Sequence, residues 1–147
     1  MTVASERELL AAVLDALVPA SGEFPAAGTV ALPHVLAAAA ASPEVDALLS
    51  RALEAVKSEA GAVGAPHFGS LDPDGRELVL RRVERSHPLP FEALLRKTYE
   101  GYYSHPAVLA RLGLDPRPPH PRGHRVESGD LGSLARVAQR GPLYRRP

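Results

Sequence analysis

The chain has 147 residues, a length that fits one domain with a core of its own. It has no cysteine, which excludes disulfides, thiol nucleophiles and thiolate metal sites. Its formal net charge is zero, but residues 1–110 have a net charge of −5 and residues 111–147 a net charge of +5. A basic tail on an acidic body folds back on that body or docks on an acidic partner.

The first helix is predicted from a capping box, Ser5 followed by Glu8, and from apolar residues that recur on one helical face. Pro19 ends this helix. Residues 20–28 are rich in Pro, Gly and Ala and predict an extended loop. A second helix is expected over residues 29–41, with its proline in the first turn.

Two further helices have clear start signals. Ser42 is the expected cap of the third helix, which two glycines near residue 64 close. Asp72 is the expected cap of the fourth, bounded by Pro88. The inward-facing side chains expected on this fourth helix are Leu78, Val79 and Val83.

The fifth helix, beginning near Pro90, places aromatic and apolar residues on one side, with Tyr102 near the centre of that stripe and Tyr103 towards its edge. Gly101 predicts the close approach of another backbone. The dipeptide His105-Pro106 interrupts the helix, and a short helix ended by a glycine follows.

From Asp115 the chain becomes Pro- and Arg-rich and loses its periodicity, which predicts an extended segment. A last short helix is expected over residues 130–140. The fold class is therefore all-α, a compact bundle of about five to seven helices. Residues 1–114 form the helical body, and residues 115–147 form the C-terminal arm of the same domain.

No phosphate-binding loop, dinucleotide fingerprint, nucleophile elbow or metalloprotease motif occurs in the sequence. Among the six histidines, only His120 and His124 are four apart, and Pro121 and Gly123 between them argue against a helical metal site. No catalytic, cofactor-binding or metal-binding residue is expected. The arginines of the arm lack interleaved aromatics, so a nucleic-acid partner is not expected.

No stretch reaches the roughly 20 apolar residues of a membrane-spanning helix. The start of the given sequence has no basic region, twin arginine or cleavage site. We therefore expect a cytoplasmic location, or a periplasmic one if a signal has been removed.

Several stretches together resemble the gluconate 2-dehydrogenase subunit 3 family. The tyrosine-rich segment fits a "T-x-E-G-Y-Y-S-H-P" pattern, and the first helix ends in a "DALVPAS"-like run. The stretches that carry the resemblance are Asp15–Ser21, Phe24–Gly28, Thr98–Pro106, Pro119–Gly123, Gly129–Leu131 and Gly141–Arg145.

The resemblance implies a non-catalytic small subunit. In that family the partner is a large FAD-containing oxidoreductase of the glucose-methanol-choline type, which oxidises sugars or sugar acids and holds the flavin. Many family members also carry a twin-arginine signal and export the large subunit with them, which this sequence does not match. The residues expected at the partner interface are Tyr103, His105, Pro106, Pro119, Pro121, Arg122, Leu131, Leu134, Tyr144 and Arg145.

Two other functions stay open at this point. The chain is either a lasting accessory subunit or a transient chaperone that releases the flavoprotein after folding. A freestanding small enzyme using Tyr and His is the third reading, although a helical tyrosine stripe more often packs than catalyses. Likewise, the arm either binds the partner or packs only on the chain's own helices.

Overall fold

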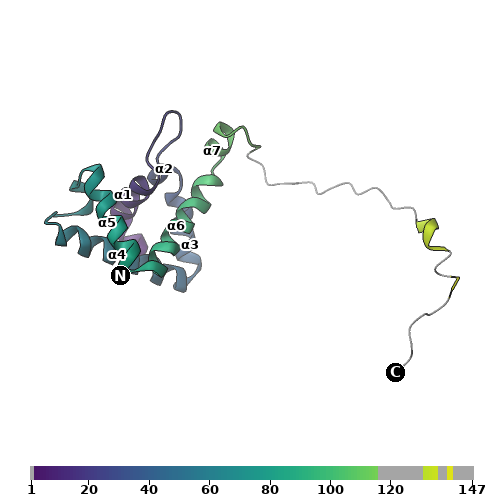
Figure 1. Ribbon diagram of the computed structural model, residues 1–147, viewed down its shortest axis with the longest axis horizontal. Helices are drawn as coiled ribbons and strands as arrows, with labels where there is room; N and C mark the ends of the chain where they lie inside the picture. The colour runs from purple at the N-terminus through teal and green to yellow at the C-terminus, as the bar shows by residue number, and fades with distance from the viewer. Residues whose placement is uncertain (1, 116–130, 136–138, 141–147) are drawn as a thin grey trace, which may run out of the picture. The chain divides into compact units, whose positions relative to one another are not determined.

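The computed structural model describes residues 2–115, 131–135 and 139–140. The chain divides into two units, residues 1–117 and 118–147, and each is described by itself. The elements of the first unit are helical apart from one antiparallel bridge between Ser21 and Phe24, which confirms the all-α class (Figure 1). Its α-helices are α1 (Arg7–Leu17), α2 (Ala27–Val30), α3 (Leu32–Ala41), α4 (Pro43–Ala62), α5 (Pro73–Ser86), α6 (Pro88–Tyr103) and α7 (Pro106–Arg111).

Helices α4 and α6, the two longest, pack on each other at the middle of the bundle, and both also contact α3 and α5. Each contributes an apolar face, as their sequence periodicity requires. The largest side chains with almost no exposed surface come from five α-helices and from the 3₁₀ turns at Val3–Glu6 and Phe68–Ser70: Val3, Leu10, Val13, Leu14, Val35, Leu49, Leu53, Val56, Phe68, Val79, Val83 and Leu94.

The predicted caps of α4 and α5 are confirmed. Ser42 Oγ accepts a hydrogen bond from the Val45 N–H at 3.3 Å, and Asp72 Oδ1 accepts one from the Gly75 N–H at 2.8 Å. In both helices a proline follows the cap. The N–H that proline lacks would have no hydrogen-bond partner within the helix at this position, so nothing is lost. These two starts depend on three or four neighbouring residues, which is why the sequence predicts them.

The capping box predicted at Ser5 and Glu8 is wrong. Residues Val3–Glu6 form a 3₁₀ turn, η1, and Ser5 Oγ donates to the Thr2 carbonyl at 2.7 Å. The cause is a distant contact: Val3 is buried, and its N–H donates to Asp46 Oδ1 on α4 at 3.1 Å. This attachment draws the start of the chain against α4 and adds a turn before α1.

Two other expectations need correction. The loop over residues 20–28 is not simply extended, because it closes the Ser21–Phe24 bridge and α2 already begins at Ala27. On α5, Leu78 is 46% exposed, and Leu80, 6% exposed, faces inward instead. Positions 79, 80 and 83 share one helical face, and Leu78 falls outside it.

In the second unit, η3 spans Leu131–Leu134, and the Gln139 N–H donates to the Ala135 carbonyl at 3.1 Å. The rest of the helix expected over residues 130–140 lies outside the described residues. Within the described parts of the chain, no helix is both long and apolar enough to cross a membrane.

Candidate partner-binding surface

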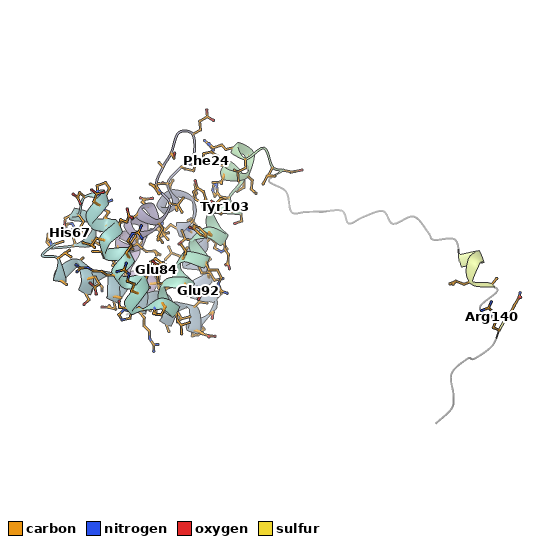
Figure 2. The ribbon with its side chains drawn as sticks, in the orientation of Figure 1. Phe24, His67, Glu84, Glu92, Tyr103 and Arg140 are labelled. Atoms are coloured by element: carbon orange, nitrogen blue, oxygen red, sulfur yellow. The ribbon has the colours of Figure 1, made fainter. Side chains whose placement is uncertain are left out.

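The C-terminal half of α6 carries three tyrosines, and the ring of Tyr103 contacts those of the other two. Tyr102 is 4% exposed, whereas Tyr99 and Tyr103 are 43% and 53% exposed. The ring of Tyr103, labelled in Figure 2, meets that of Tyr99 with centroids 5.9 Å apart and that of Tyr102 at 5.3 Å, both edge to face. The buried ring of Tyr102 therefore supports that of Tyr103, which in turn contacts Tyr99, and the exposed pair offers aromatic surface held by these contacts.

Tyr102 is fixed at its polar end as well. Its hydroxyl donates to the Pro25 carbonyl at 2.9 Å, which joins α6 to the loop before α2. Burial raises the pKa of Tyr102, and the neighbouring Tyr103 adds to the increase. The phenol therefore stays protonated at neutral pH, which disfavours a role as a general base.

The backbone of α3 lies directly against α6 at Gly101, as the sequence predicted. A Cβ at Gly101 would lie 2.9 Å from the Cβ of His34 and 3.1 Å from the Ala31 carbonyl oxygen. Any larger residue would push the two helices apart. Glycine is therefore required at position 101 for the close packing of α6 against α3.

The loop between α1 and α2 is clamped to α1. Asp15 Oδ1 accepts a hydrogen bond from the Gly28 N–H at 2.7 Å, and the Ala27 N–H donates to the Val18 carbonyl at 3.0 Å. A Cβ at Gly28 would lie 2.5 Å from the Ala11 carbonyl oxygen. Together with the Tyr102–Pro25 bond, these contacts bring the end of α1, the loop and the tyrosine segment into one corner.

Charged side chains next to the tyrosines are grouped around Glu100. Glu100 Oε2 accepts a hydrogen bond from Lys97 Nζ at 2.5 Å, and His34 Nε2 lies 3.6 Å from the same oxygen. Arg96 Nε lies 3.9 Å from Glu100 Oε1. The hydrogen bond from Lys97 is the main cause that lowers the pKa of Glu100. The tyrosines are therefore flanked by one carboxylate and by the two basic side chains paired with it, Lys97 and Arg96.

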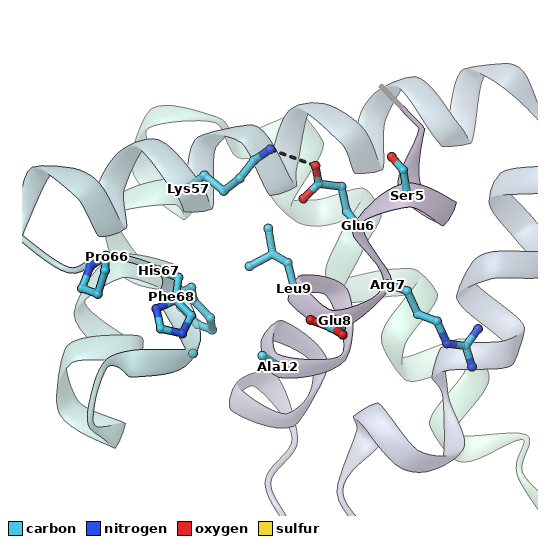
Figure 3. Close-up of a pocket in the computed structure, with 11 residues that line it drawn as sticks. Ser5, Glu6, Arg7, Glu8, Leu9, Ala12, Lys57, Pro66, His67 and Phe68 are labelled. Carbon is cyan, nitrogen blue, oxygen red and sulfur yellow. Dashed lines mark hydrogen bonds and ion pairs between the residues drawn. The ribbon is translucent and has the colours of Figure 1, made fainter.

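A hollow of about 750 Å³ lies at the other end of α1, between η1, α4 and the loop that carries η2 (Phe68–Ser70) (Figure 3). Leu9, Ala12 and Phe68 give it an apolar side. Lys57 Nζ lies 3.0 Å from Glu6 Oε1, the dashed contact in Figure 3, and 2.9 Å from Glu54 Oε1. The bond to Glu54 is the main cause that raises the pKa of Lys57.

Sequence reasoning missed this hollow because its residues come from three separate segments and match no motif. Within the part of the chain that the structure describes, no group of three His, Asp or Glu side chains is placed to hold a metal ion. One salt bridge of Lys57 joins η1 to α4 and the other lies within α4, both ordinary structural contacts, so the hollow by itself indicates no reaction.

The family model for gluconate 2-dehydrogenase subunit 3 matches residues 4–115. The chain belongs to this family. The matched residues contain all seven described α-helices and all of η1 but its first residue, so the subunit 3 match covers the helical unit from within η1 to the residues after α7. Neither the curated proteins nor the solved structures gave a match to the chain.

Three residues expected at the partner interface lie within this subunit 3 unit. Tyr103 is exposed, and Pro106, also exposed, is the first residue of α7. His105 is half-buried, and its Nδ1 accepts a hydrogen bond from the Ala107 N–H at 3.3 Å, which caps α7. His105 therefore has a structural role whether or not it also contacts a partner.

The other expected interface residues belong to the arm, beyond the subunit 3 match. Leu134 is 55% exposed within the second unit, and the backbone of Leu131 begins η3. Those that lie outside the described residues are Pro119, Pro121, Arg122, Tyr144 and Arg145. Their interface role stays a prediction.

Proposed function

We propose that this chain is the non-catalytic small subunit that binds and stabilises a large FAD-dependent oxidoreductase of the glucose-methanol-choline type, acting on a sugar or sugar acid. The observation that carries the proposal is the family match over residues 4–115, because the family is named for a subunit of a dehydrogenase. The exposed rings of Tyr99 and Tyr103 support it, since exposed aromatic side chains on a rigid helix are typical of protein interfaces.

In this proposal the flavin belongs to the large subunit. The sequence has no phosphate-binding loop and no dinucleotide fingerprint, which supports placing the flavin in the partner. The larger hollow of the small subunit is lined by Glu6 and Glu8 beside Arg7, and its Lys57 is already paired with Glu6 and Glu54. We expect the purified small subunit to show no flavin absorbance.

Coexpression with a glucose-methanol-choline oxidoreductase from the same genome tests the proposal. The two chains should copurify through size exclusion at a fixed ratio, with one FAD per large subunit and sugar oxidation by the complex. The large subunit expressed alone should be less soluble or less stable.

Two outcomes would contradict this function. A flavoprotein that stays active and stable after the small chain has left it would identify a transient chaperone. Stoichiometric FAD on the isolated small chain, or sugar oxidation by it, would identify an enzyme.

A further inference from the structure

A second groove, of about 540 Å³, lies between α1, α5 and α6. Its apolar lining includes side chains from all three helices: Leu17, Leu80, Phe91, Leu95 and Tyr99. Tyr103, whose ring meets that of Tyr99, extends this aromatic surface along α6. The groove is therefore continuous with the tyrosine corner.

The spacing on α6 explains why this surface stays open. Phe91, Leu95, Tyr99 and Tyr103 follow one another at intervals of four residues and form a single ridge along the helix. Phe91 is 7% exposed, Tyr99 43% and Tyr103 53%, so the ridge leaves the core as it runs towards α7. The neighbouring stripe, which contains Leu94, Thr98 and Tyr102, packs in the core.

Two of the stretches that carry the resemblance to the family, Asp15–Ser21 and Thr98–Pro106, reach the groove. Asp15, Leu17 and Pro19 line it from the end of α1, and Tyr99 lines it from the tyrosine segment. These segments are more than 75 residues apart in the sequence, and the fold places them on one surface. The groove is therefore a product of the packed bundle rather than of one continuous segment.

The charges of the groove indicate what kind of segment fits it. Three acidic residues line it, Asp15, Glu77 and Glu84. Two basic residues also line it, Arg76 and Arg81. Arg81 Nη2 is 2.7 Å from Glu77 Oε1, so these two charges neutralise each other. Glu84 has no salt bridge to any residue within the described ranges. Its carboxylate is available to a basic group of an occupant.

We propose that this groove receives an apolar segment of the large subunit, with a Lys or Arg of that segment beside Glu84. The inference rests on the proposed function and adds the location of the contact. A ridge with a four-residue repeat beside an apolar groove suits an amphipathic helix, which would place its own apolar side chains against Leu95 and Tyr99. The unpaired carboxylate then sets the orientation of that helix.

Binding of the full-length small subunit to the purified large subunit tests this location. Tyr99→Ala removes the exposed aromatic ring, and Glu84→Lys reverses the unpaired charge. Each should weaken binding by about tenfold or more, as expected for a central interface residue, with an unchanged melting temperature.

Two matched variants serve as controls. Leu78→Ala removes a side chain that is 46% exposed, close to the 43% of Tyr99, but lies on α5 outside the groove. Glu92→Lys makes the same charge change as Glu84→Lys at an exposed position of α6 that does not line the groove. Both should bind within about twofold of the parent chain, well short of the loss expected at a central interface residue.

The outcomes separate this inference from the function on which it rests. If the parent chain binds the large subunit and Tyr99→Ala and Glu84→Lys bind equally well, the groove is not the contact, although the proposed function stands. If the parent chain does not bind the large subunit at all, both the proposed function and the proposed groove contact fail. A dimer of the isolated chain that Tyr99→Ala dissociates would identify a second copy as the occupant. A cross-link between α6 and residues 116–147 of the same chain would identify the arm. Either result would overturn the proposal.

Discussion

Tyr102 links the core of the subunit to its exposed aromatic surface. The ring is buried, its hydroxyl bonds to the Pro25 carbonyl, and its edge supports Tyr103. Tyr102→Ala should lower the free energy of unfolding by about 3–5 kcal/mol, the range for large aromatic truncations. Tyr102→Phe keeps the ring, loses one hydrogen bond and should cost about 1 kcal/mol. Urea denaturation at pH 7 measures both, and an alanine variant as stable as the parent would show that the ring is not part of the core.

Two helical glycines predict opposite results for the same substitution. Gly101→Ala forces a Cβ to within 2.9 Å of the Cβ of His34, so it should destabilise the fold by about 1–3 kcal/mol. Gly61, near the end of α4, has no atom within 4 Å of an added Cβ, and Gly61→Ala should stabilise the fold by about 0.5–1 kcal/mol. Thermal unfolding of both variants tests the pair. Equal shifts of the same sign would mean that α3 does not restrict position 101.

At the scale of the elements, Glu100 connects α6 to α3 and predicts a pH dependence. Its pKa is lowered below the ordinary value of 4.5, mainly by the hydrogen bond from Lys97. The carboxylate therefore adds stability above about pH 4.5, which is lost as the pH falls through the lower pKa of the folded state. Glu100→Gln should lower the melting temperature slightly at pH 7, because the side chain is 40% exposed, and by less at pH 3. An equal decrease at both pH values would assign the effect to packing.

How well the sequence predicts each element depends on how far apart along the chain the residues that shape it lie. The caps at Ser42 and Asp72 are local, and both were predicted correctly. The 3₁₀ turn before α1 depends on Val3 meeting Asp46, 43 residues away, and no local pattern contains that information. The inward position of Leu80 rather than Leu78 likewise depends on how α5 packs, since both are leucines in an apolar stretch.

The candidate surface was predicted only in part for the same reason. The tyrosine segment is continuous in sequence, so its importance and the close approach at Gly101 could be inferred from spacing. The groove combines residues of α1, α5 and α6, and only the packed bundle shows that Glu84 and Tyr99 line one surface. The hydrogen bond from the Tyr102 hydroxyl to the Pro25 carbonyl joins residues 77 apart in the chain, so it could not be inferred from the sequence either.

At the scale of the whole molecule, core and charge are divided unevenly along the chain. The buried cluster of the described residues lies entirely between Val3 and Val108. Residues 111–147 instead carry eight arginines, and residues 115–147 hold six of the 15 prolines. Helical packing therefore belongs to the first unit, and the basic charge of the C-terminal residues is available for long-range attraction.

This division predicts the effect of removing residues 116–147. The remaining chain keeps every member of the buried cluster, so its melting temperature should stay within a few degrees of the parent's. Copurification with the large subunit should be lost, because a tethered second contact can raise affinity by about 10²–10⁴-fold without any change in the first. Binding of the full chain should also weaken with added salt, since arginine contacts at a surface are screened over about 10 Å at 0.1 M. A full chain with Leu134→Ala and Tyr144→Ala should bind more weakly and keep its salt dependence. If truncation instead lowers the melting temperature sharply while the truncated chain still binds the large subunit in the cold, these residues stabilise their own helices and the contact with the partner lies on the bundle alone.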